Sequence, residues 1–378
     1  MNGTGLPRRV HDGVVRRYGL AAGGLGLAAV LTAAAPGSSA HQGAALTASR
    51  PDAVTARFNY LTGVSAVSSS GAWAVGDNPG LVLHWTGTRW AQTPIPHPAS
   101  SALESVSALP AGGAWAVGAR GLLRTTTLAL HWNGTAWSPV ATPSPGKYSQ
   151  LTSVSAVSPA DAFAVGFNPG LALHWTGTGW AQTPIPHPAS SALYGVSALS
   201  ASNAWAVGTL SGKTLVLHWN GTAWTRVPSP NVNGNGELSG VAALPAGDAW
   251  AVGDYTAGKA EKTLVLHWNG TTWTRVPSPS PGKSPVKDSL AGVSALSAGN
   301  AWAVGRAGGK TLALHWNGTT WTRIPSPSPR GQGIGPFTVL TGVSAVSPTD
   351  AWAVGCACTS DVDITLVLHW NGKTWTRS

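Results

Sequence analysis

The chain repeats one pattern of apolar and polar positions seven times. Each copy opens with Leu-x-x-Val-x-Ala. There follow a short polar turn, the run Ala-Trp-Ala-Val-Gly and a variable loop. The copy ends with Leu-x-Leu-His-Trp, a two-residue turn with Gly, and a final Trp. The copies begin at Leu61, Leu103, Leu151, Leu193, Leu238, Leu290 and Leu340. Their spacing of about 40 to 50 residues is typical of propellers, helical solenoids and other repeat arrays.

Each copy contains four short apolar runs separated by Gly, Asn, Asp, Ser and Pro, which is the pattern of β-strands. No run has the length or the composition of a helix. Asn-Gly between two Trp-bearing runs, as in 132–135, indicates a tight hairpin. Apolar runs such as 72–75 leave no polar face, so both faces of each sheet are expected to be covered. The pattern predicts an all-β fold, a seven-bladed β-propeller of four-stranded antiparallel blades, over residues 61–378.

The first 40 residues have the composition of an export signal. Four arginines lie within residues 1–17, an apolar stretch follows over 19–35, and the small residue Ala40 suits a cleavage site. Arg16-Arg17 with the residues after it resembles a twin-arginine signal, so both export routes stay open. The apolar stretch is short and glycine-rich for a membrane span. We therefore expect a secreted or cell-surface protein without a stable span after cleavage, and a linker over 41–60 that could supply a strand to close the ring.

Tryptophan is the anomaly of the composition, with 20 Trp against 5 Tyr and 4 Phe. Every Trp is a repeat residue, three to a copy, with Phe163 in one of the places. A ligand-stacking ring would stand out as an exception to the repeat, so these rings are expected to fill the wedges between blades. With only 2 Cys and 10% charged residues, the chain is neither a disulfide scaffold nor a coiled coil.

The net charge of +10 comes from 23 Lys and Arg against 13 Asp and Glu. Such an excess is compatible with nucleic acid, an anionic membrane or an acidic wall polymer as partner. The basic residues are scattered among the repeats and form no run. This distribution predicts a solvated surface, and no nucleic-acid partner.

Candidate catalytic and metal-binding residues are sparse. Asp161, Asp248 and Asp350 stand in first turns where other copies have Asn or Gly, so they are expected to be turn residues. No carboxylate pair recurs at a spacing that suits general acid and base catalysis. The histidines of Leu-x-Leu-His-Trp lie on the third strand from the axis. Equivalent histidines should therefore be more than about 10 Å apart, too far to share a metal. We predict no catalytic residue, no metal and no cofactor.

Cys356 and Cys358 are separated by one Ala in the variable loop after Gly355. In an exported protein an oxidised pair is expected, and a disulfide here would staple the loop. An intermolecular disulfide is the alternative.

The run from Asn300 to Pro325, with Ala-Trp-Ala-Val-Gly and His-Trp-Asn-Gly-Thr-Thr-Trp, resembles the Kelch repeat. It is also similar to the Asp-box (BNR-type) repeats of sialidase-like and photosystem-assembly-type propellers. The resemblance covers residues 61–378 and implies a propeller fold. Kelch has a double Gly where this chain has a single one, as at Gly76, and the Asp of the Asp-box is replaced by Trp, as at Trp85. Both families include enzymes and binding proteins, so the resemblance does not decide function.

The variable loops of all copies should lie on one face, because antiparallel strands place the second turn and the blade-to-blade connection at the same end. Insertions gathered on one face typically mark the binding face of a repeat protein. The candidate contact residues there are Arg120, Arg124, Tyr148, Tyr255, Lys259, Glu261, Arg330, Phe337, Asp361 and Asp363.

Residues 78–103 and 168–193 are almost identical, which indicates a duplication of two copies. Duplicated blades suit a scaffold or a multivalent binder better than a catalytic centre, with His97 and His187 as paired surface elements. We therefore predict a secreted, monomeric, non-catalytic binding module for a glycan, a wall polymer or a protein ligand. The alternatives are a propeller-type carbohydrate-active enzyme, either a glycoside hydrolase or an oxidase, and a cell-surface protein-interaction scaffold.

Overall fold

The computed structural model describes residues 60–77, 80–121, 124–232, 234–282, 287–329, 337–358 and 363–378. The predicted signal segment and the linker as far as residue 59 lie outside the described residues. The described regular elements are β-strands, together with two short 3-10 turns at Pro98–Ser100 and Pro188–Ser190. In this part of the chain, no helix has the length and apolar character needed to cross a membrane.

The strands follow the repeats, four to each. They are β1 (Tyr60–Ser68), β2 (Gly71–Asp77), β3 (Leu81–Trp85) and β4 (Trp90–Gln92); β5 (Ser101–Ala108), β6 (Ala114–Arg120), β7 (Thr126–Trp132) and β8 (Trp137–Val140); β9 (Gln150–Ser158), β10 (Asp161–Phe167), β11 (Leu171–Trp175) and β12 (Trp180–Gln182); β13 (Ser191–Ser200), β14 (Asn203–Leu210), β15 (Lys213–Trp219) and β16 (Trp224–Arg226); β17 (Glu237–Ala243), β18 (Ala249–Ala257), β19 (Ala260–Trp268) and β20 (Trp273–Arg275); β21 (Asp288–Ser297), β22 (Asn300–Ala307), β23 (Lys310–Trp316) and β24 (Trp321–Ile324); and β25 (Phe337–Ser347), β26 (Asp350–Cys358), β27 (Asp363–Trp370) and β28 (Trp375–Arg377).

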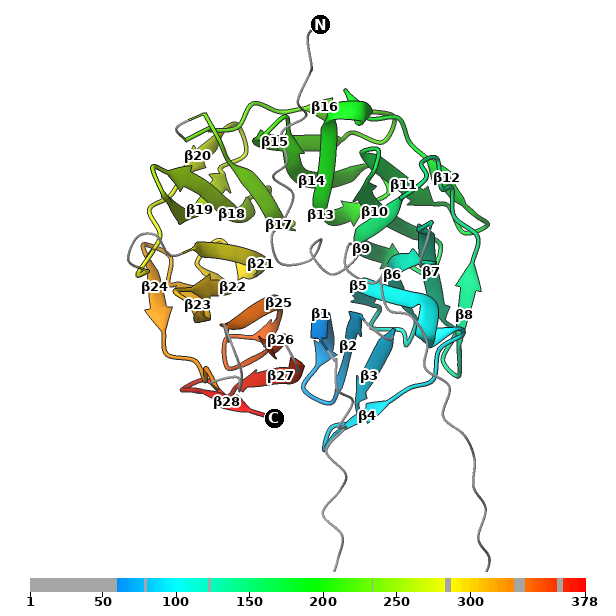
Figure 1. Ribbon diagram of the computed structural model, residues 1–378, viewed down its shortest axis with the longest axis horizontal. Coiled ribbons are helices and arrows are strands. Elements are labelled where there is room, and N and C mark those ends of the chain that lie inside the picture. The colour runs from blue at the N-terminus through cyan, green and yellow to red at the C-terminus, as the bar shows by residue number, and fades with distance from the viewer. Residues whose placement is uncertain are drawn as a thin grey trace, which may run out of the picture. The chain divides into compact units, whose positions relative to one another are not determined.

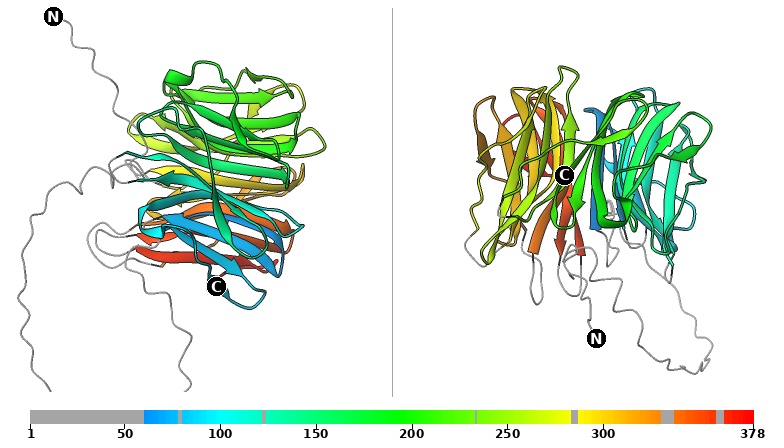
Figure 2. Two further views of the ribbon diagram at one scale, coloured as in Figure 1. Left: turned by 90° about the vertical axis from the view of Figure 1, so that its right-hand side faces the viewer. Right: turned by 90° about the horizontal axis from the view of Figure 1, so that it is seen from above.

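Hydrogen bonding groups the described strands into six sheets, where the repeat count predicts seven. Five sheets have four antiparallel strands, one repeat each. The sixth has eight strands, because Asp77 at the end of β2 pairs with Ala102 of β5 and so links the first two repeats. The sheets surround a common centre, with β1, β5, β9, β13, β17, β21 and β25 innermost (Figure 1). Side views show the strands running between two faces of this ring (Figure 2).

A β-bulge recurs at the start of every innermost strand. In β1 the pairing passes from Leu61 to Gly63, so Thr62 is the extra residue, and the corresponding step recurs in the other six innermost strands. The strand opposite carries the Gly of Ala-Trp-Ala-Val-Gly, and a Cβ there would collide with a carbonyl oxygen, as Gly118 would with that of Ala102. The repeated Gly is therefore required by the bulge. A bulge changes the direction in which its extra side chain points. The extra residues of the seven innermost strands line the central channel.

The tryptophans pack between neighbouring repeats, as their recurrence predicts. The ring of Trp115 lies 4.9 Å from that of Trp175 and 5.1 Å from that of Trp180 (centroid to centroid), both in the next repeat. The last repeat makes the same contact with the first, since Trp352 lies 4.8 Å from Trp85. Large aromatic rings in tilted and edge-on contact bury much apolar area, and this compensates for the small residues beside them.

Serine hydroxyls also join neighbouring innermost strands. The Oγ of Ser65 accepts a hydrogen bond from the Ala108 backbone N–H at 3.0 Å. The same bond closes the ring, where the Ala66 N–H donates to the Oγ of Ser344 at 3.0 Å. The first and last repeats are thus joined by side-chain contacts, and no described strand is shared between them.

Candidate binding face

The second hairpin loops and the connections between repeats lie at the end where each innermost strand begins. We call this end the variable face. The register requires it: Tyr60 at the start of β1 pairs with Asp77 at the end of β2, whereas Ser68 and Gly71 close a tight turn at the opposite end. The candidate contact residues that the structure describes come from segments of the variable face.

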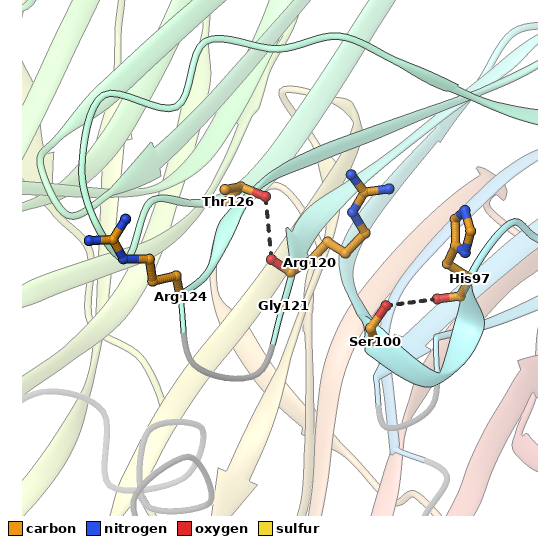
Figure 3. A pocket seen from close by; sticks show the side chains of 6 residues that line it. All are labelled: His97, Ser100, Arg120, Gly121, Arg124 and Thr126. Atoms are coloured by element: carbon orange, nitrogen blue, oxygen red, sulfur yellow. Dashed lines mark hydrogen bonds between the residues drawn. The ribbon is translucent and has the colours of Figure 1, made fainter.

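A shallow pocket of about 380 Å³ lies on the variable face, lined by His97, Ser100, Arg120, Gly121, Arg124 and Thr126. Its size falls in the range of ligand pockets, roughly 300 to 1,000 Å³. Both arginines are exposed. Among the described residues, neither Arg120 nor Arg124 forms an ion pair. Figure 3 shows the two guanidinium groups and the His97 ring as separate groups, and the two exposed arginines make this surface cationic.

Backbone structure holds these side chains in place. Arg120 ends β6 and pairs with Thr126, whose hydroxyl donates to the Arg120 carbonyl at 3.3 Å. His97 has a left-handed backbone conformation, with φ of 50°, and its carbonyl accepts the Ser101 hydroxyl at 2.9 Å. The Gly121 N–H donates to the Ser100 carbonyl at 2.9 Å. The loop 97–101 and the β6–β7 hairpin are therefore hydrogen-bonded to each other beside the pocket, whose lining side chains are drawn in Figure 3.

Tyr148 comes from the connection that runs beside the start of β7. It forms a parallel bridge with Thr125, which stands between Arg124 and Thr126. Its side chain is 49% exposed, and the Lys147 ammonium lies 5.2 Å from the centre of its ring. The pocket thus brings together two candidates from the sequence, Arg120 and Arg124, while the bridge to Thr125 places the Tyr148 side chain on the other face of the hairpin. His97, predicted from the sequence only as a paired element with His187, lines the same pocket.

The candidates of the fifth repeat have partners within the chain. The Arg275 guanidinium donates to the Tyr255 hydroxyl at 2.8 Å and lies 4.7 Å from its ring. The Glu261 carboxylate forms an ion pair with Lys287 at 3.0 Å. Lys259 is exposed at the turn between β18 and β19. No contact with the Arg120 pocket is found for these described residues.

The remaining candidates belong to the last repeat. Phe337 begins β25 and is half-buried. Cys356 and Cys358 are buried in β26 and joined by a disulfide, so they belong to a strand where the sequence predicts a loop. The strand continues past Gly355 because its partners in β25 and β27 are long. Arg330 and Asp361 lie outside the described residues, and Asp363 is described only by its backbone, at the start of β27.

The central channel also contains the carboxyl group of Glu104, which is not among the site residues predicted from the sequence. Glu104 is the bulge residue of its repeat, where three other repeats have Thr, and its Oε1 accepts a hydrogen bond from the Gln150 amide at 2.7 Å. Burial, and secondarily the nearby Asp77 carboxylate, raise the pKa of Glu104 to about 8, against a lowering by the Gln150 hydrogen bond. In the sequence, Glu104 is marked by standing at a repeat position where three other repeats have Thr. The channel cavity of about 160 Å³ is smaller than common ligand pockets.

A second group of acids lies around Glu237 at the start of β17. Burial and, secondarily, repulsion from Glu261 raise the pKa of Glu237 to about 7, against a lowering by Lys287. Glu237 and Asp254 are paired residues of β17 and β18. Burial and these two carboxylates also raise the pKa of Tyr194 above its usual range. The electrostatic neighbours of Glu104 and Glu237 differ, so they belong to separate groups.

The repeated histidines have structural partners on the opposite face. The His174 Nε2 contacts the Asp161 carboxylate at 2.7 Å, and the ring of His174 stacks on that of Phe163. Asn203 contacts the His218 ring in the same way, at 3.0 Å. The first-turn Asp and Asn residues are therefore partners of histidine. Within the described residues, no three His, Cys, Asp or Glu side chains gather as a metal site.

Solved structures with the same fold are β-propellers. A structure of YCF48 bound to D1 peptide aligns with a TM-score of 0.53 at 16% identity, over 79% of this chain and 91% of its own. Virginiamycin B lyase from Staphylococcus aureus has a TM-score of 0.57 at 11% identity, over 79% and 91%. The WD40 β-propeller domain of Doa1 has a TM-score of 0.57 at 12% identity, over 80% and 91%. No protein-family profile and no curated protein sequence matches this chain. At these identities the likeness establishes the β-propeller fold alone.

Proposed function

We propose that this chain is a secreted, non-catalytic binding module that holds an anionic partner at the pocket of Arg120, Arg124 and His97. The observation that carries the proposal is the pocket itself: two arginines without ion-pair partners among the described residues line a cavity of about 380 Å³. Arginine presents a fork of donors that suits carboxylate and phosphate groups. The partner is a glycan or wall polymer that bears such groups, and a protein ligand is the alternative.

The same proposal includes the architecture and the destination of the protein. The fold is a seven-bladed ring in which the eight-stranded sheet represents two blades joined by the single pair Asp77 and Ala102. The seven repeats, each with its own bulge, support this assignment. The basic and apolar composition of residues 1–40 supports export by a cleaved signal, and the repeat phrase supports a Kelch-like or Asp-box-like origin. The protein acts as a monomer.

An enzyme is the second candidate function, and Glu104 is the observation that favours it. A carboxyl group with a pKa of about 8 is protonated at neutral pH and so resembles a general acid. One of the similar structures is a lyase. The small channel around Glu104 argues for the binding module, since a sugar-sized substrate needs more room. The interaction scaffold is represented by YCF48, whose structure holds a peptide.

The proposal is tested by measuring the affinity of the full chain for anionic and neutral polymers at low and moderate salt. The wild type should bind only the anionic polymers, and more weakly as salt screens the charges. Arg120→Ala with Arg124→Ala should weaken binding about tenfold or more. Lys213→Ala removes an exposed cation from the same face and should have little effect. Equal affinity of the double variant and the wild type contradicts the proposal, and turnover of the bound polymer favours the enzyme.

A further inference from the structure

Resting on this proposed function, we propose that the ligand is a polyol phosphate, a polymer in which phosphodiesters alternate with hydroxyl-bearing spacers. Its phosphates bind the guanidinium groups of Arg120 and Arg124. Its alcohol groups bind the hydroxyl oxygens of Ser100 and Thr126. The inference starts from the pocket lining, because the groups that the lining residues leave free to bond determine what they recognise.

The strongest free groups of the pocket are cationic donors. The backbone carbonyls of His97, Ser100 and Arg120 all accept hydrogen bonds from within the chain. The side chains of Arg120 and Arg124 are exposed, and neither forms an ion pair with a described residue. A ligand must therefore supply negative charge and acceptors. A phosphodiester supplies both through its non-bridging oxygens, which suit the guanidinium fork, and it brings no donor of its own.

The two hydroxyl groups of the lining have used their protons. The Thr126 hydroxyl donates to the Arg120 carbonyl at 3.3 Å, and the Ser100 hydroxyl donates to the His97 carbonyl at 3.4 Å (Figure 3). A hydroxyl has a single proton, so both oxygens can bind a ligand only as acceptors. Alcohol groups between the phosphates supply the matching donors, whereas inorganic polyphosphate has none.

The two cations are held as separate groups on one hairpin. Gly121 has φ of 112°, and a Cβ there would collide with the Arg124 carbonyl oxygen, so the backbone that carries both arginines requires this Gly. Figure 3 shows the guanidinium groups of Arg120 and Arg124 apart from each other. Two separate cations suit charges that repeat along a chain better than one compact anion.

The lining favours a flexible spacer over a ring. The described lining residues contain one ring, that of His97, and no aliphatic side chain. Single-stranded nucleic acid binds through successive aromatic platforms, and the C–H face of a sugar ring needs apolar surface. Oligonucleotides and polyuronates therefore suit this lining less well than a polyol phosphate.

The copied loop, 187–191, is an internal control. It has the same left-handed His, with φ of 52°, and it is joined to its hairpin by the same kind of bond, from the Ser211 N–H to the Ser190 carbonyl at 3.2 Å. That hairpin pairs Leu210 with Lys213 where the first copy pairs an arginine with a threonine. Lys213 is thus an exposed cation of the same face outside the proposed site.

The test is an equilibrium titration of the full chain with poly(glycerol phosphate), inorganic polyphosphate, polygalacturonate and a single-stranded oligonucleotide, matched in the number of charges. Poly(glycerol phosphate) should bind about tenfold tighter than polygalacturonate and the oligonucleotide. Thr126→Val should weaken binding of poly(glycerol phosphate) about fivefold and leave that of polyphosphate unchanged. Thr126→Ser keeps the hydroxyl and should restore most of the lost affinity, and Lys213→Ala should bind as the wild type does.

The outcomes separate the two proposals. If polygalacturonate or the oligonucleotide binds as tightly as poly(glycerol phosphate), the polyol phosphate is wrong. It is also wrong if Thr126→Val weakens all polymers equally or none. In each of these cases the anionic site stands, provided that the double variant Arg120→Ala with Arg124→Ala loses binding. If no anionic polymer binds, or the double variant binds normally, the proposed function itself fails.

Discussion

The substitution Glu104→Gln tests the electrostatics of the central channel. Gln has the shape of the protonated carboxyl group but cannot ionise. The pKa of Glu104 is raised to about 8 in the folded chain, against an ordinary value of 4.5. The folded protein therefore binds more protons than the unfolded chain between these values. Stability contributed by this group is complete below pH 4.5 and is lost as the pH rises through about 8.

The size of the effect follows from the same difference. Ionisation of Glu104 lowers the free energy of unfolding by at most about 5 kcal/mol between pH 4 and pH 9, and relaxation of the channel will reduce this figure. Glu104→Gln should thus raise the Tm at pH 9 by on the order of 5 °C and change it little at pH 5. Thermal unfolding followed by circular dichroism at a series of pH values measures this. Asp77→Asn should give a smaller change in the same direction, because Asp77 is the second cause of the raised pKa. An equal effect of Glu104→Gln at pH 5 and pH 9 would refute the reasoning.

Three stability predictions follow from the repeat. Gly118→Ala places a Cβ against the Ala102 carbonyl and should lower the free energy of unfolding by several kcal/mol. Denaturant titration measures this. An unchanged midpoint would contradict the claim that the bulge requires Gly. Ala242 stands where the other repeats have the serine that bonds to the next repeat. Ala242→Ser should therefore give the Ala295 N–H an acceptor and raise the free energy of unfolding by about 1 kcal/mol. A loss of stability would mean that the hydroxyl does not fit. Trp352→Ala should lower the free energy of unfolding by about 3 to 5 kcal/mol and weaken the contact between the first and last repeats. Hydrogen exchange in β1 and β25 should then be faster. Unchanged exchange there would exclude a role of Trp352 in closing the ring.

The fold was largely predictable because it is repetitive. One repeat contains every strand, and the recurrence of Trp in each copy correctly indicated contacts between neighbours. The sheet count was not predictable, because the pair Asp77 and Ala102 depends on how two non-equivalent segments approach. The role of the repeated Gly was also hidden, since it follows from a bulge. A bulge shifts the register by one residue, and that shift is what places Glu104 in the channel.

The candidate site was predictable in part. The variable face followed from antiparallel alternation, and Arg120 and Arg124 were found as loop cations. The same reasoning predicts Tyr255 as a contact residue, yet its hydroxyl accepts a hydrogen bond from Arg275, 20 positions further along the chain. The sequence does not show whether an exposed loop residue is bonded to a side chain from a distant segment. Tertiary contacts therefore decide which candidates are free to bind a ligand.

Charge reversal at the pocket tests the central claim most directly. Arg120→Glu with Arg124→Glu should abolish binding of polygalacturonate, an acidic glycan used as the anionic probe, and create binding of polylysine. The matched control, Lys213→Glu with Lys310→Glu, lowers the net charge equally at exposed positions of the same face. The account predicts that the control retains affinity for polygalacturonate within about threefold and gains none for polylysine. Equal losses in the two double variants would show that only overall charge attracts the ligand, and would contradict a site at Arg120 and Arg124.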